Sequence, residues 1–447
     1  MKLVKLSLVA VMALGTSAFA IDNVKVNGEA KLWYQTSEYS GGATAVPAAT
    51  AAQGFFDNTA NSSADVKLSV GATADLLQNL SAGVKVTAIS TLGLENNLVG
   101  STTTAKVGAD GTNYQNTAVG GDMSSLNDQA WVEEAYLAYT AGKTTAKIGR
   151  QALNTPLAFT ETWNVVDNTF EAAVLLNNDL PNTTLVAAWV GKHNGVGLLG
   201  DPDAAGPLVT GRNTTVAKDG TFSTFATDGA YAFAAVNKSL PNTTVQAWYY
   251  DVVQVADAYW LQADTKVIDM VNIGVQYAGM MPDVGTGAAD RNTDVFALKA
   301  AVDIAGVNLY AAYSTVSAGT LGFANVATGD KSSVYTTLGS IYMDGEIAAA
   351  PDTDAWKIGA STKMVPGVAL SASYAQAETG NNGGTAGLVA GLSTQNTDFT
   401  AWDVTAATKV GAVDLTAIYT QFDKDVKAND NNDKTTDTFR VIASLKF

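Results

Sequence analysis

A period-two alternation of apolar and polar residues recurs along this chain and constrains its fold more than any other feature. The alternation runs through residues 24–35, 65–76 and 438–447. Alternation over about ten residues is typical of a strand with one apolar face and one wet face. The pattern therefore predicts an all-β protein. In the last segment the apolar positions are Phe439, Val441, Ala443, Leu445 and Phe447.

Two properties of these strands favour a membrane barrel over a soluble β-sandwich, whose strands also alternate. The predicted strands run for about 10–12 residues, whereas strands of globular proteins usually run for about 5–6. Small residues occupy the apolar face as often as large ones, which suits a wall that faces lipid. Beyond the N-terminal segment no run of about 18 apolar residues could form a spanning helix. A closed, antiparallel transmembrane β-barrel then satisfies every backbone group in lipid.

Eight short turns divide the chain into strands, and each carries an Asn, Asp, Gly or Pro corner of the kind that tight turns require. Outer-membrane barrels have short periplasmic turns, long outer loops and both termini in the periplasm, so eight turns predict about 18 strands. About 16 strands would follow if one turn were over-counted. The turns lie near Asn79, 141–143, 180–182, 240–242, 267–269, Ile304, Val365 and Val410.

Long polar connections separate these turns, and about 20 residues are expected in each outer loop. No linker or second domain interrupts the pattern, so residues 21–447 are predicted to form one barrel domain. The longest outer segments are expected at 36–63, 93–127, 193–228, 317–354 and 378–399.

Residues 1–20 have the features of a secretory signal peptide. Lys2 and Lys5 give a basic start, residues 6–14 are apolar, and an Ala-Phe-Ala cleavage sequence ends at Ala20. The apolar stretch is too short for a transmembrane anchor. We therefore expect cleavage after Ala20 and a location in the outer membrane of a Gram-negative bacterium.

The composition argues against an enzyme and against a nucleic-acid-binding protein. The chain has no cysteine and one histidine, which excludes disulfides and thiol catalysis and leaves little basis for histidine-dependent catalysis. Its formal net charge is −16, and loss of Lys2 and Lys5 with the signal would make it −18. That sign disfavours nucleic acid as a partner. We expect no cofactor and no metal site.

Three local patterns have simple explanations. Residues 195–200 match a dinucleotide-binding glycine pattern, but no helix is expected after them. His193 is expected to be a solvated loop residue rather than a metal ligand. The residues between Asp423 and Asp437 lack the Gly and Glu of a calcium-binding EF-hand loop.

Aromatic residues in or beside the strands are expected to form the girdles that mark the membrane interfaces of a barrel. Ordinary burial is the alternative. The residues are Trp189, Trp248, Trp260, Trp402, Tyr249, Tyr250 and Tyr259.

An aromatic C-terminus closes the last alternating strand. Phe447 looks like the signal by which the barrel-assembly machinery recognises outer-membrane proteins. Leu445 and Phe439 share its face of the strand and complete the predicted assembly signal.

The segment from Ile148 to Pro156, which continues to residues 168–172, is the most distinctive in the chain. Its Gly-Arg-Gln and Leu-Asn-Thr sequences resemble those of the OprD-like porins, and most closely the Campylobacter-type major outer-membrane porins. Weaker similarity extends to the start of the signal, to residues 296–299 and to the Leu-Lys-Phe end. The resemblance implies an eighteen-stranded barrel, usually a homotrimer, whose third loop (about 151–170) folds into the lumen. The chain departs from members that take up basic solutes, because it shows no arginine ladder.

These observations predict a general diffusion porin with a mild cation preference. Its mechanism would be a water-filled lumen, a narrow waist and fixed charges that focus ions. Candidate waist residues are Arg150, Glu161 and Asp167, and wall candidates from strand parity are Glu134 and Lys147. A merely polar inner wall is the alternative interpretation of these five residues.

Expected partners are outer-membrane lipid, lipopolysaccharide, the barrel-assembly machinery, small hydrophilic solutes and ions. A barrel that acts mainly as an adhesin or surface-structural protein is the alternative function, because long loops rich in small residues suit either role. An outer-membrane enzyme is disfavoured by the lone histidine, which is expected in a loop.

Overall fold

The structure is a computed structural model. It describes residues 21–41, 54–56, 62–92, 128–195, 216–226, 228–283, 291–339, 347–380, 396–427 and 433–447. The expected signal at 1–20 and much of the predicted outer segments lie outside the described residues.

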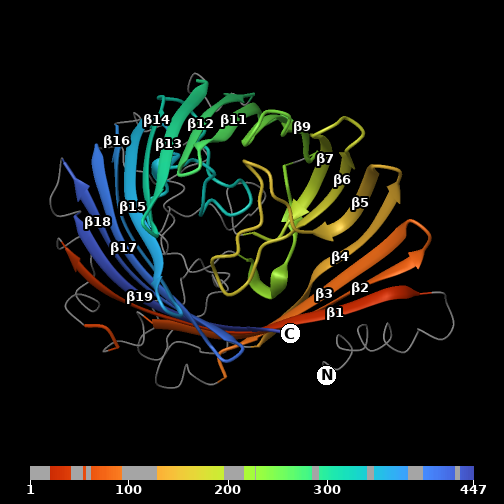
Figure 1. Cartoon of the computed structure of the whole chain (residues 1–447), viewed down its shortest axis with the longest axis horizontal. Helices are drawn as coiled ribbons and strands as arrows, with labels where there is room; N and C mark the ends of the chain where they lie inside the picture. Colours follow the sequence, from red (N-terminus) through yellow and green to blue (C-terminus); the bar gives the residue numbers. More distant parts are fainter. Residues whose placement is uncertain are drawn as a thin grey trace.

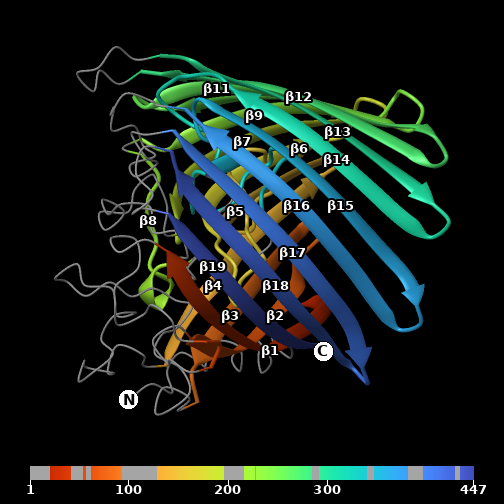
Figure 2. The ribbon, with the colours of Figure 1, turned by 90° about the vertical axis from the view of Figure 1, so that its left-hand side faces the viewer.

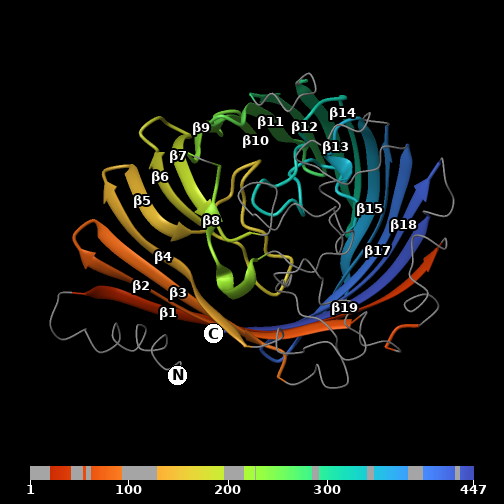
Figure 3. The same ribbon diagram turned by 180° about the vertical axis from the view of Figure 1, so that it is seen from behind.

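The described strands form a closed, all-β barrel with eighteen antiparallel wall strands, as predicted (Figures 1 and 3). β1 pairs with β19 and so closes the ring. A two-residue strand, β8 (Ser223–Thr224), only extends the sheet at the end of β7. The wall strands are β1 (Asp22–Gly41), β2 (Ser62–Leu77), β3 (Leu80–Ser90), β4 (Gln129–Ala141), β5 (Thr144–Gln151), β6 (Phe170–Asn177), β7 (Thr183–His193), β9 (Ala230–Asn237), β10 (Thr243–Val252), β11 (Ala256–Ile268), β12 (Val271–Pro282), β13 (Thr293–Ile304), β14 (Val307–Val316), β15 (Thr353–Val365), β16 (Val368–Thr379), β17 (Thr397–Val410), β18 (Val413–Val426) and β19 (Lys434–Lys446).

The strands run obliquely around the barrel (Figure 2). Their outer face carries exposed apolar side chains, and both polar and apolar side chains are buried on the inner face. On β1, Leu32 is exposed on the outer face, whereas Trp33 is buried on the inner face. On β19 the inward Arg440 is buried. Successive side chains of a strand point to opposite faces, so the alternation read from the sequence becomes this separation. Among the described residues, no helix is long and apolar enough to cross a membrane.

All eight predicted turns join consecutive wall strands. The two Leu-Pro-Asn-Thr-Thr repeats adopt the same turn, because Asn182 and Asn242 both have a φ of 53°. Asn tolerates this left-handed conformation better than most residues. In each repeat the hydroxyl of the first Thr (Thr183 or Thr243) donates to the Pro carbonyl two residues earlier, at 3.1 and 2.9 Å.

Three outer connections, at 253–255, 283–292 and 427–433, are shorter than expected, and the first is much the shortest of the three. Only residues 253–255 join β10 to β11, so the expectation of about 20 residues in every outer loop is wrong there. β10 and β11 extend further towards this turn than the alternation indicated. Val255 N–H donates to the carbonyl of Val252 at 2.8 Å and closes the turn.

The aromatic prediction is correct for some residues and wrong for others. Trp189, Trp402 and Tyr249 are exposed on the outer wall, as girdle residues should be. Trp248 and Trp260 instead point inward and are buried. Tyr250, also predicted for the girdle, is buried inside with them. Neighbouring aromatic residues on one strand have opposite parity, so they cannot all reach lipid.

The C-terminal residue is bound to the first strand. Phe447 N–H donates to the carbonyl of Gly28 at 3.0 Å, and Gly28 N–H donates to the Phe447 carbonyl at 2.7 Å. A Cβ at position 28 would lie 2.4 Å from Cζ of the Phe447 ring, so the glycine leaves room for the ring. Phe447 therefore completes the seam between β1 and β19.

We predict that deletion of Phe447 reduces the amount of folded barrel, because the seam loses this backbone pair and the ring over Gly28. The measurement is the fraction of protein in outer-membrane fractions that migrates faster before boiling than after it. Gly28→Ala displaces the ring but keeps the aromatic terminus. Normal levels of folded barrel after the deletion would contradict the prediction, and normal levels for Gly28→Ala alone would assign the effect to the terminus itself.

Candidate functional site

Two segments of chain lie inside the ring of strands and narrow it (Figures 1 and 3). We call residues 152–169, between β5 and β6, the constriction loop, and residues 317–339, after β14, the second inward segment. Val326 N–H donates to the Leu157 carbonyl at 2.9 Å, and the Ser333 hydroxyl donates to the Pro156 carbonyl at 2.8 Å. The two segments therefore form one body across the lumen.

The constriction loop begins with a tight hairpin made by the distinctive Leu-Asn-Thr-Pro sequence. Thr160 N–H donates to the Leu153 carbonyl at 2.8 Å, and Asn154 bridges Phe159. The Thr155 hydroxyl donates to the Ala158 carbonyl at 2.8 Å, which closes the tip. These local bonds give the loop a shape of its own before it meets the second inward segment.

An apolar pad fixes the tip of the loop to one wall. Leu157 packs in a buried cluster with Trp248 and Trp260 of the wall and with Leu321 and Phe323 of the second inward segment. Burying such side chains is worth roughly 1.5–3 kcal/mol each. On this side the tip of the loop is packed against the wall of the barrel.

Glu161 lies at the junction of the two segments and is buried. Its Oε1 accepts hydrogen bonds from Asn325 Nδ2 at 2.9 Å and from the Thr328 hydroxyl at 2.5 Å, as well as from the Lys331 backbone N–H at 3.1 Å. Its Oε2 accepts from Trp163 Nε1 at 2.6 Å. A buried carboxylate needs such donors to offset its lost hydration. The structure thus places Glu161 within the body that narrows the lumen rather than on its water-facing surface.

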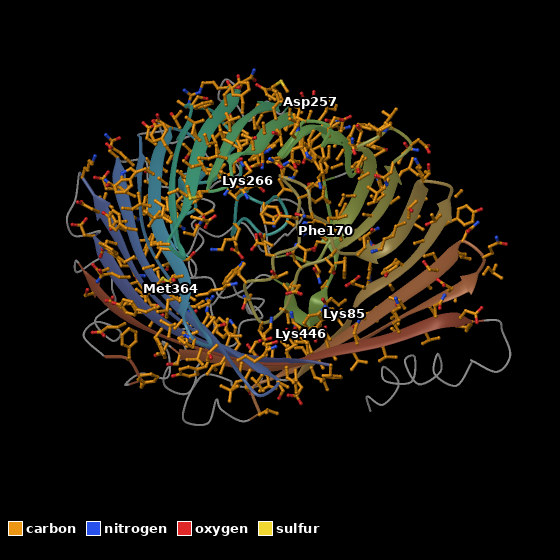
Figure 4. All side chains as sticks on the ribbon, viewed as in Figure 1. Lys85, Phe170, Asp257, Lys266, Met364 and Lys446 are labelled. Carbon is orange, nitrogen blue, oxygen red and sulfur yellow. The ribbon has the colours of Figure 1, made fainter. Side chains whose placement is uncertain are left out.

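Asp167 faces a cluster of charges on the wall made by β1–β4. Lys85 Nζ lies 2.6 Å from Glu133 Oε1 and 3.9 Å from Asp167 Oδ2. Figure 4 shows Lys85 on the inner side of the ring. Beside them Lys67 Nζ lies 2.5 Å from Glu29 Oε2. We call Glu29, Lys31, Lys67, Lys85, Glu133 and Asp167 the wall charge cluster, in which three lysines balance three carboxylates.

A second ion pair lies on the opposite wall. Lys299 Nζ is 2.6 Å from Asp264 Oδ1 and 4.0 Å from the centre of the Tyr335 ring. The Tyr335 hydroxyl donates to Asp264 at 3.0 Å. Burial, and then the nearby charge of Asp264, raise the pKa of the Tyr335 hydroxyl, so it remains a neutral donor at physiological pH. Both walls at the waist therefore present paired charges of opposite sign.

Of the other three predicted site residues, Glu134 lies beside the wall charge cluster, because it is opposite Lys85 in the register of β3 and β4. Lys147 lies midway along β5, and its Nζ is 3.7 Å from the centre of the Tyr136 ring. Arg150 pairs with Glu171 at 3.0 Å and shares a pocket with Ile148 and Trp189, both exposed on the outer wall, so it lies on the outer face of the barrel.

Several inward residues were missed from the sequence, most clearly Arg440, Trp163 and Lys31. Arg440 is fully buried and lies between two tryptophan rings. Its position in the alternation of the last strand indicates an inward side chain, so the sequence contains a signal for it. Lys31 occupies a polar position of the first alternating segment, and its Nζ donates to the Asn164 carbonyl at 3.2 Å. No local pattern marks Trp163, whose two cationic partners, Lys331 and Arg440, are distant in sequence.

The prediction for His193 is wrong, because the residue ends β7 and is fully buried rather than solvated. Its ring lies edge-on to Phe225, with centres 5.5 Å apart, and 6.5 Å from the Phe170 ring. Phe170 is on the inner side of the ring of strands (Figure 4). Within the described ranges, no group of three or more His, Asp or Glu side chains is placed to hold a metal ion.

A closed barrel of this size with an inward constriction is the architecture of outer-membrane porins. The chain matches the sequence profile of the Campylobacter major outer membrane protein over residues 1–447 and belongs to that family. A search of curated proteins finds no match.

Solved OprD-like porins have the same fold. OccK9 (OpdG) of Pseudomonas aeruginosa superposes with a TM-score of 0.68 at 12% identity, over 95% of this chain and 99% of that one. OccK8 (OprE) of the same organism gives 0.67 at 12% identity, over 96% and 99%. OccAB3 of Acinetobacter baumannii gives 0.65 at 11% identity, over 95% and 100%. At these identities the likeness concerns the fold alone.

We predict that Glu161→Ala loosens the contact between the constriction loop and the second inward segment. A hydrogen bond to a charged group contributes about 1.5–3 kcal/mol, so loss of about 2 kcal/mol would speed exchange of the Val326 amide about 30-fold. Hydrogen exchange measured by mass spectrometry on the detergent-solubilised barrel tests this. Glu134→Ala, on the barrel wall, is the matched control, and equal exchange in both variants would contradict the role of Glu161.

Proposed function

We propose that this chain forms a passive diffusion channel for small hydrophilic solutes and ions in the outer membrane. Family membership and the closed barrel support an outer-membrane channel. The observation that carries the proposal is the body formed by the constriction loop and the second inward segment, which occupies part of the lumen. Charged pairs of the inner wall lie around this body. Solutes would be selected by size at this waist and by the charges around it.

The cation preference that we propose is mild for a physical reason. The wall charge cluster and the Lys299–Asp264 pair are each neutral overall. Opposite charges a few ångströms apart cancel at longer range, and screening at physiological salt acts over about 8 Å. The whole chain remains acidic, with a formal net charge of −16, and supplies the residual preference.

We predict a modest cation preference in planar-bilayer recordings under a salt gradient. Asp167→Asn should shift the reversal potential towards anion permeation, because it leaves the lysines of the wall charge cluster in excess. Arg150→Gln should leave the reversal potential unchanged, since Arg150 lies on the outer face. A clear anion preference of the unmodified channel would contradict the proposed selectivity. A barrel that acts mainly as an adhesin predicts no conductance in the same recording.

Delivery to the membrane is part of the same proposal. We propose that residues 1–20 are removed after Ala20, and that the barrel-assembly machinery recognises Phe447 together with Leu445 and Phe439. Phe439 and Leu445 lie on the outer face of β19, and Phe447 follows directly after the strand, so the three form one apolar face, which supports this. The finished barrel would face lipopolysaccharide in the outer leaflet.

We also propose that the chain assembles as a homotrimer through the wall around β5, β6 and β9. Each of these strands has 8 residues. At about 3.3 Å per residue and a tilt of about 45°, such a strand rises about 19 Å, less than the apolar band of about 25 Å that barrels present to lipid. On β5, Ala146 and Ile148 are followed on the outer face by the charged Arg150.

The chemistry of this wall suits protein better than lipid. Arg150 Nε and Lys192 Nζ lie 3.0 and 3.7 Å from the carboxylate of Glu171, which forms an outward ion cluster at the ends of the short strands. Below it, alanines leave a groove between larger apolar side chains of neighbouring strands. A second copy could fill the groove and pair with the ions, and identical copies favour closed symmetric assemblies.

We predict that Arg150→Glu converts trimers to monomers in native electrophoresis, because it replaces the ion pair with Glu171 by two neighbouring carboxylates at the contact. Lys409→Glu is the control, since Lys409 is exposed on another wall and pairs with Asp414 at 3.2 Å. A monomeric unmodified protein, or an Arg150→Glu variant that stays trimeric, would contradict this interface.

A further inference from the structure

Trp163 sits where the constriction loop meets both the wall and the second inward segment. Its ring centre lies 5.1 Å from Arg440 Cζ and 5.3 Å from Lys331 Nζ. Its Nε1 donates to Glu161 Oε2 at 2.6 Å. One side chain thus contacts a cation of the barrel wall, a cation of the other inward segment and the buried carboxylate that joins them.

Arg440 presents a rigid surface to this ring. Its guanidinium lies 4.6 Å from the centre of the Trp33 ring on the wall, and its Nε and Nη2 both donate to Gln35 Oε1, at 3.0 and 2.6 Å. These two bonds fix the plane of the guanidinium. A planar, weakly hydrated cation stacks on indole rings better than an ammonium group does. Because Arg440 is fully buried, its attraction to the rings is little screened by water.

We infer that the stack Trp33–Arg440–Trp163 is a latch that holds the constriction loop against the β1–β19 seam and so sets the width of the channel. Trp163 and Arg440 are positioning residues that do not themselves need to touch the solute. Lys31 strengthens the same contact through its bond to the Asn164 carbonyl at 3.2 Å. The inference rests on the proposed channel function.

The latch ties the width of the waist to the seam that closes the barrel. Trp33 belongs to β1 and Arg440 to β19, so the two wall residues of the stack come from the first and the last strand, which pair at the seam. Without the latch the loop would still be attached at its tip by the apolar pad around Leu157, and near its end by Val165 and Val166, which are buried with Trp131 of the wall. We therefore expect local motion within residues 162–167, centred on Trp163, rather than loss of the whole constriction.

The test uses Trp163→Leu, because this substitution lies on the loop and leaves the barrel wall intact. Desolvated cation–π contacts predict about a tenfold faster amide exchange at residues 162–167. In single-channel records we expect a larger mean conductance and more current noise. Arg440→Lys should give the same changes, since it keeps the charge but loses the planar stack. Lys434→Gln is the matched control. Lys434 lies on β19, as Arg440 does, and its substitution removes a cation–π contact with the Tyr39 ring.

The outcomes separate clearly. The effect of the double variant Trp163→Leu/Arg440→Lys should be smaller than the sum of the two single effects, because both substitutions remove the contact between the Trp163 ring and Arg440. Exchange and current noise in Trp163→Leu equal to those of Lys434→Gln would overturn the latch, as would additive effects in the double variant. If the heat-modifiability assay shows that Arg440→Lys does not fold, the latch is judged from Trp163→Leu alone. A lack of conductance in the unmodified protein would instead contradict the proposed function. The latch would then be tested by the hydrogen-exchange result alone.

Discussion

The hydrogen-bonded seam between β1 and β19 is the constraint on which the rest of this structure depends. It pairs residues 29–41 with residues 434–446, and the Gly28–Phe447 pair continues it. In lipid a sheet edge with unpaired backbone groups would cost several kcal/mol for each group, so the ring must close. Once it closes, the parity of every strand assigns one face to lipid and one to the lumen, and the inward side chains must find water or partners.

The inward polar groups find those partners largely in the two segments that enter the lumen. Glu161 receives donors from a segment more than 160 residues away in sequence, and the wall charge cluster receives Asp167. The same contacts that satisfy buried charges also build the constriction. In this family member the waist is therefore a packed, hydrogen-bonded body, and most of its charges are paired with opposite charges.

The sequence predicted the parts of the fold that local periodicity determines. Alternation and turn residues such as Asn182 and Asn242 gave the strands, the turn positions and the count of eighteen. Periodicity could not say which of two adjacent aromatic residues faces inward, so Trp248 was assigned to the wrong face. A register shift between Lys85 and Val86, where β3 pairs with β4, likewise changes which neighbouring residues line the lumen. Most partners of Glu161 and Trp163 lie far away in sequence, in the second inward segment and in β19, and no local pattern encodes them.

The most direct test of the account is the size of solute that the channel admits. Liposomes that contain the purified protein should swell with small sugars and not with larger ones. Replacing residues 157–166 by a short Gly-Ser linker should raise the size limit, because it removes the tip, the Glu161 junction and the Trp163 contact together. An unchanged size limit in that variant, with the barrel still folded, would contradict the claim that the constriction loop forms the waist.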